Sequence, residues 1–115
     1  HRRRPRDPAT QRGYTVLAML NPTPAEKLCD RDGHPYFLWD VETTLDAFRL
    51  QLVDPDPDVR AHAMGKLMRQ ARPDDALNLL SLAQIRGEWE RVRPYLGNRR
   101  EFWAWLIPEL ERRAR

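Results

Sequence analysis

Residues 45–67, LDAFRLQLVDPDPDVRAHAMGKL, decide the fold. Apolar residues recur at helical spacing on both sides of an acidic turn, Asp54-Pro55-Asp56-Pro57. Each proline disfavours the α conformation in the residue before it, so the first helix has to end at this turn. Asp56 can cap a second helix, and Pro57 suits its first position. The stretch therefore predicts a helical hairpin, with helices over about residues 44–53 and 57–71.

The second predicted helix has an apolar face wider than the usual stripe of roughly 100°. Arg60 falls near the middle of that face. A buried guanidinium has to be paired, and the nearest carboxylates in the sequence belong to Asp54 and Asp56. We therefore expect Asp54, Asp56 and Arg60 to stabilise the turn, with Arg60 turned inward and paired to these aspartates. A direct contact of Arg60 with a partner is the alternative.

The hairpin resembles one HEAT-type helical repeat, in which a helix ends in Asp-x-Asp-Pro-x-Val-Arg and a second helix follows. The resemblance implies that the Asp and Arg positions hold the turn, and that the unit contributes to a surface for binding other macromolecules. Only one clean repeat is present, whereas a free-standing solenoid needs about three. A compact domain with one HEAT-like hairpin is therefore expected, and a long array is not.

Capping signals place further helices around the hairpin. A short helix should begin at Thr23-Pro24-Ala25-Glu26, another at Arg72-Pro73, and a third at the capping box Ser81-Leu82-Ala83-Gln84. The last helix should begin near Asn98. We predict an all-α fold, a compact bundle of four to five helices with an irregular N-terminal third. Residues 1–13 are expected to be a disordered basic tail, and residues 14–115 a single helical domain.

The net charge of +3 is unevenly distributed. Residues 1–13 carry five arginines and one aspartate, residues 99–115 carry five arginines and three glutamates, and the body between them is mildly acidic. No apolar run approaches the roughly 18 residues of a membrane helix, so a membrane partner is not expected. Cys29 is the only cysteine, which excludes an intrachain disulfide and favours a cytoplasmic protein.

The sequence contains no recognisable catalytic or metal-binding motif. The three histidines are scattered, and no Gly-rich phosphate loop, nucleophile elbow or His-Glu-x-x-His pattern occurs. Cys29 and His34 are too isolated to predict a zinc site. Asp54, Asp56 and Asp58 resemble a calcium loop only superficially, because prolines alternate with them. We therefore predict a protein that is not an enzyme and that holds no cofactor or metal.

Binding of a partner is better supported than catalysis. The run Tyr36-Phe37-Leu38-Trp39 is apolar in a predicted loop, so it either covers one end of the core or contacts a partner. Arginines lie close to aromatic residues near the C-terminus, a combination enriched in protein interfaces and also suited to stacking on bases. The alternative is that these aromatics belong to the core and the arginines are solvated. The predicted contact residues are Tyr36, Phe37, Trp39, Arg99, Arg100 and Trp105.

Four blocks in this order resemble a family of small proteins found beside nucleotidyltransferase-type toxins in toxin–antitoxin and abortive-infection systems. The blocks are Phe37 to Asp40, Asp54 to Lys66, Gly65 to Arg72, and Leu96-Gly97 with Arg100 to Leu106. The resemblance implies a small helical partner that binds and restrains a toxin enzyme, and it identifies no catalytic residue. Two other readings stay open: a nucleic-acid-binding module that uses the basic termini, and a HEAT-like scaffold or regulatory subunit.

Overall fold

The structure, a computed structural model, describes residues 19–114. These residues form α-helices and 3₁₀ turns (η) and no β-strand, which confirms the predicted all-α fold. The expectations for residues 1–13 and 14–18 lie outside the described part. The elements, in chain order, are α2 (Ala25–Leu28), η1 (Tyr36–Leu38), α3 (Leu45–Leu52), α4 (Pro57–Gln70), α5 (Pro73–Leu79), α6 (Leu82–Gly87), α7 (Trp89–Val92), η2 (Arg93–Tyr95), η3 (Gly97–Arg99) and α8 (Arg100–Arg113).

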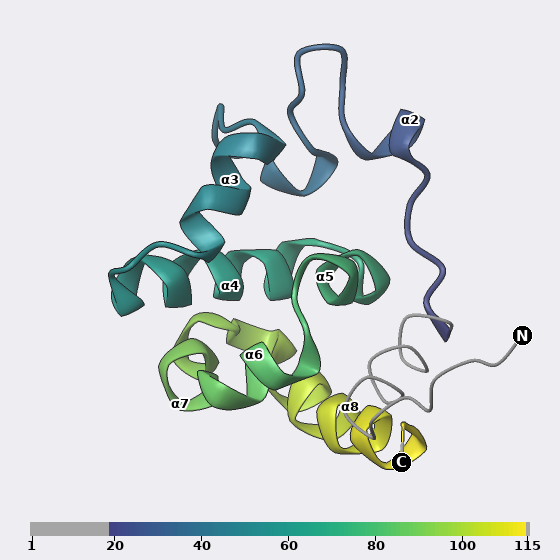
Figure 1. The fold of residues 1–115 in the computed structure, drawn as a ribbon, viewed down its shortest axis with the longest axis vertical. Helices are drawn as coiled ribbons and strands as arrows, with labels where there is room; N and C mark the ends of the chain where they lie inside the picture. The colour runs from purple at the N-terminus through teal and green to yellow at the C-terminus, as the bar shows by residue number, and fades with distance from the viewer. Residues whose placement is uncertain (1–18, 115) are drawn as a thin grey trace, which may run out of the picture.

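Helix α4 is the centre of the domain. In Figure 1 it runs across the middle of the molecule, with α3 and α2 above it and α6, α7 and α8 below it. A helix covered on two sides needs a wide apolar face, as the sequence predicted. Val59 also lies on the predicted apolar face of α4, but 38% of it is exposed. The buried residues of α4 are Ala61, Ala63, Met64, Gly65, Leu67 and Met68.

Side-chain caps define where the main helices begin. The Thr44 hydroxyl accepts a hydrogen bond from the Ala47 amide at the start of α3, and the Asp56 carboxylate accepts one from the Asp58 amide at the start of α4. Ser81 and Gln84 form the predicted reciprocal capping box of α6. These signals are local in sequence, because each cap bonds to an amide within the next three residues. Thr23 does not cap α2, because its side chain binds Asp75 instead.

Arg60 pairs with the carboxylate of Glu88, which the sequence did not predict. Its Nη2 lies 2.7 Å from Oε1 of Glu88, and its Nε also donates to both oxygens of that carboxylate. Nη1 donates to the main-chain carbonyls of Asp54 and Pro55. The predicted pairing with the Asp54 and Asp56 carboxylates is therefore wrong. Those carboxylates accept amide bonds within their own turn, and Arg60 joins that turn to the residue preceding α7.

Gly65 allows η2 to approach α4 closely. A Cβ atom added to Gly65 would lie 2.4 Å from the Tyr95 Cβ, far inside van der Waals contact. We expect Gly65→Ala to lower the free energy of unfolding by about 1–3 kcal/mol, because the overlap outweighs the gain of about 1 kcal/mol in helix propensity. Urea unfolding at an unchanged m-value measures the loss.

Gly87 is the matched control, since an added Cβ there meets nothing within 4 Å. It ends α6 with no positive φ, so Gly87→Ala should be neutral or stabilising by up to about 1 kcal/mol. Equal effects of the two substitutions would show that the contact between Gly65 and Tyr95 does not limit packing.

Candidate partner-binding surface

Large apolar side chains that reach solvent are concentrated on one part of the chain. Six of the nine among the described residues lie between positions 36 and 59, in or next to η1, α3 and the start of α4. Trp39 is the largest of them, and 70% of it is exposed. A concentration of exposed apolar side chains marks an interaction site more often than scattered single residues do. The six residues are Tyr36, Trp39, Val41, Leu50, Val53 and Val59.

Trp39 belongs to a ridge, residues 38–42, that separates two hollows. Leu38 and Val41 line both hollows. The first hollow, of about 510 Å³, lies against α3 and α4 and includes Phe48, Val59 and His62 among its lining residues. The second, of about 530 Å³, lies on the α2 side, and Trp39 lines it. We call residues 38–42 the Trp39 ridge.

The Trp39 ridge is held to α4 by polar contacts. Nε2 of Gln70 donates to the Phe37 carbonyl at 2.7 Å, and the Lys66 ammonium lies 2.8 Å from Oδ2 of Asp40. The hydrogen bond from Lys66 lowers the pKa of the Asp40 carboxyl below its ordinary value. Below the ridge, the Phe37 ring packs edge-on against Phe48 at 5.6 Å. The ridge therefore presents Trp39 from a backbone that is fixed on both sides.

The four residues of the run 36–39 have different environments. Phe37 is fully buried, so it is a core residue, and its prediction as a contact residue was wrong. Tyr36 is partly exposed, but its hydroxyl donates to the Asp75 carboxylate at 2.6 Å and accepts from the Arg72 amide at 2.8 Å. Leu38 is buried between the hollows. Trp39 is thus the residue of the run that offers a large free surface.

The second predicted group lies at the start of α8. The Arg99 guanidinium sits 5.6 Å from the centre of the Phe102 ring, and the Trp105 ring is 6.2 Å from that ring. Trp105 is 59% exposed, and Arg100 is exposed. Figure 1 shows α8 on the opposite side of α4 from the segment before α3. The residues predicted as contacts therefore fall into two separate groups, on elements that lie on opposite sides of α4.

The two sides of α4 differ in charge. Residues 36–59 carry six carboxylates and one arginine, a net charge of −5. Residues 82–114 carry seven arginines and five glutamates, a net charge of +2. The Trp39 ridge lies in the acidic part and Trp105 in the basic part, so the two groups suit partners of opposite charge.

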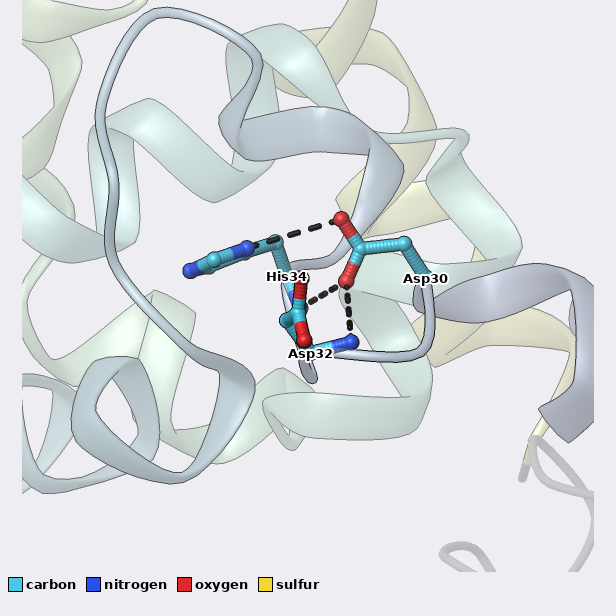
Figure 2. A group of neighbouring side chains, drawn as sticks. All are labelled: Asp30, Asp32 and His34. Carbon is cyan, nitrogen blue, oxygen red and sulfur yellow. Dashed lines mark hydrogen bonds and ion pairs between the residues drawn. The ribbon is translucent and has the colours of Figure 1, made fainter.

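Asp30, Asp32 and His34 bring three metal-ligand atoms within 4.8 Å of one another, as Figure 2 shows. Oδ1 of Asp30 accepts hydrogen bonds from the Asp32 and His34 amides, and Oδ2 lies 3.5 Å from Nδ1 of His34. The His34 amide bond is the main reason why the pKa of Asp30 lies below its ordinary value. Gly33 supplies the positive φ that this turn needs. Turn formation explains all three residues, and we assign them no metal.

Asp75 is a buried side chain that supports the surface and that the sequence did not predict. It is only 3% exposed, and it accepts three hydrogen bonds of 2.6–2.7 Å, from the Thr23 amide, the Thr23 hydroxyl and the Tyr36 hydroxyl. Burial alone would raise the pKa of Asp75, but these hydrogen bonds hold it below its ordinary value. Through Tyr36, Asp75 fixes one wall of the second hollow. An Asp in a helix's first turn is common, so nothing in the local sequence marked it.

Comparison with known proteins identifies no relative. The chain matches no family model, no curated protein and no solved structure. None of the helices within residues 19–114 is long and apolar enough to cross a membrane.

Proposed function

We propose that this protein is a non-enzymatic protein-interaction module, an antitoxin-like partner that binds and restrains a nucleotidyltransferase-type toxin. The observation that carries the binding role is the 70% exposure of Trp39 on a ridge anchored between two hollows. Tryptophan is enriched at the residues that dominate interface energetics, and a fixed backbone lowers the entropic cost of binding. The resemblance of residues 37–107 to the toxin-associated family supplies the class of partner.

The proposed mechanism is steric. The Trp39 ridge would occupy the toxin's active-site cleft and block access of its substrates. The net charge of −5 on residues 36–59 supports this, because a cleft that binds nucleotides or RNA is generally basic. This mechanism requires no chemical step from the side chains of this protein.

Co-purification and inhibition test the proposal. The protein is expressed with any nucleotidyltransferase that is encoded beside its gene, and the transferase activity is measured as the protein is added. We expect a stoichiometric complex and loss of activity at equimolar protein. A toxin that stays fully active in an excess of this protein, with no complex on size-exclusion chromatography, would contradict the proposal.

A second candidate function is binding of single-stranded nucleic acid through the start of α8. Arg99 over Phe102, beside the exposed Arg100 and Trp105, supports it, because bases stack on aromatic rings and arginines neutralise phosphates. Affinity for a labelled RNA should then fall steeply between about 50 and 200 mM salt and weaken in Trp105→Ala. RNA affinity that does not change with salt would exclude this candidate.

A further inference from the structure

We infer that the Trp39 ridge binds a basic segment of a protein partner that presents apolar side chains to the two hollows, and that Trp39 determines most of the affinity. This inference rests on the proposed role in protein interaction and specifies the chemistry of the partner. It applies to the side of α4 that carries η1 and α3, not to the start of α8.

The apolar part of the inference comes from the hollows. Both are open to solvent, and they lie on either side of a single ridge. Leu38, Val41 and Phe48 give the first hollow an apolar wall, whereas Leu28, Tyr36 and Trp39 give one to the second. An enclosed ligand pocket buries most of a small molecule. Two open hollows that flank a ridge instead suit side chains projecting from a larger surface.

The basic part comes from the charges around the hollows. Asp58 lines the first hollow, and Asp30 and Glu42 line the second. Lys66 lines the first as well, but it pairs with Asp40, and only 14% of its side chain is exposed. Lys27 lines the second hollow and is in no ion pair within the described part of the chain. Phosphates would be repelled here, which favours a protein partner over a nucleic acid.

The dominant role of Trp39 follows from its position. It combines the largest exposed apolar side chain of the ridge with a place on the wall of the second hollow. Interface energy concentrates on central aromatic residues surrounded by contacts that exclude water. The exposed Leu50 and Val53 lie in or after α3 and line neither hollow, so they should contribute less.

Titration of the isotope-labelled protein with two synthetic peptides tests the inference. One is a short amphipathic peptide of Arg and Leu, and the other has Glu in place of Arg. We expect the basic peptide to shift the amide resonances of residues 38–42 and 58–66, and the acidic peptide to shift none. Trp39→Ala should lower the affinity for the basic peptide about tenfold, equivalent to about 1.4 kcal/mol of binding free energy. Trp105→Ala is the matched control and should bind normally.

Several outcomes would overturn the inference. These are equal binding of both peptides, unchanged affinity in Trp39→Ala, shifts confined to α8, and concentration-dependent ridge shifts of the protein alone, which would indicate a second copy as the occupant. Thermal melting checks that Trp39→Ala folds, as its exposure predicts. A toxin bound through Trp105 would overturn this inference and the proposed blocking of the cleft by the ridge, but it would leave the proposed restraint of a toxin standing. A basic peptide that binds at the ridge, with no complex between this protein and the toxin, would support this inference and contradict the proposed function.

Discussion

Replacing Trp103 with alanine is expected to lower the free energy of unfolding by about 3–5 kcal/mol. Trp103 is fully buried and is the largest of the fully buried side chains. Its indole also donates a hydrogen bond of 2.8 Å to the Met68 carbonyl, which joins α8 to α4. Domains of this size are stable by about 5–15 kcal/mol, so the loss is a large share of the total. Urea unfolding followed by circular dichroism measures it.

Trp103→Phe separates the hydrogen bond from the packing and keeps the prediction testable if the alanine variant fails to fold. The Met68 carbonyl has no usual helical partner, because the Arg72 amide donates to Tyr36 instead. Losing the indole N–H therefore leaves a buried carbonyl unsatisfied, and we expect a loss of about 1–3 kcal/mol. The amide resonances near Met68 should shift most in this variant, because its carbonyl is the group that loses the hydrogen bond.

Trp105 provides the control on the same helix. It is two residues from Trp103 but 59% exposed, so Trp105→Ala should change stability by no more than about 0.5 kcal/mol. Similar losses in Trp103→Ala and Trp105→Ala would mean that α8 is not fastened to α4 through the buried indole.

Features with local signals could be predicted from the sequence. The caps at Thr44, Asp56 and Ser81 each bond to an amide within three residues, so their residue types and spacing are sufficient. The partner of Arg60 could not be found this way. Glu88 lies 28 residues further along the chain, and only the packing of α7 against α4 brings it close.

The candidate surface was predicted in part, for the same reason. An apolar run in a loop is expected either to be buried or to contact a partner, but the sequence alone does not show which residues are buried and which are exposed. The 3₁₀ turn η1 places Phe37 against Phe48 and leaves Trp39 outside. The separation of Trp39 from Trp105 depends on which side of α4 each helix packs against, and that is a property of the whole fold.

Replacing Asp75 with asparagine is expected to lower the free energy of unfolding by about 2–4 kcal/mol. The Asp75 carboxylate accepts hydrogen bonds from the Thr23 amide, the Thr23 hydroxyl and the Tyr36 hydroxyl, using both of its oxygens. An amide has one acceptor oxygen, so at least one of these donors would face an NH₂ group. Asp75 is buried, and water cannot replace the lost acceptor. Chemical unfolding at neutral pH measures the difference.

The same carboxylate should make stability depend on pH. Its hydrogen bonds outweigh burial and keep the pKa of Asp75 in the folded protein below the ordinary value of 3.8. The unfolded state therefore binds the proton more readily, so this stabilisation is complete above the unfolded pKa and is lost as the pH falls through the folded one. The melting temperature of Asp75→Asn should fall less steeply in acid than that of the unmodified protein. Some slope will remain, because the pKa values of Glu88 and Asp40 are lowered too.

Asp74 is the matched control, because it occupies the same turn of α5 and has the same chemistry. Its carboxylate accepts one bond, from the Asn21 amide, at an exposed site, so Asp74→Asn should cost less than about 1 kcal/mol. Loss of the Asp75 carboxylate should also weaken the hydrogen bond that the Tyr36 hydroxyl donates, and so disturb the second hollow. Loss of the Asp74 carboxylate should not. Amide shifts at residues 36–42 that are identical in the two variants would refute this coupling, because Asp75 would then support α5 alone and not the Trp39 ridge.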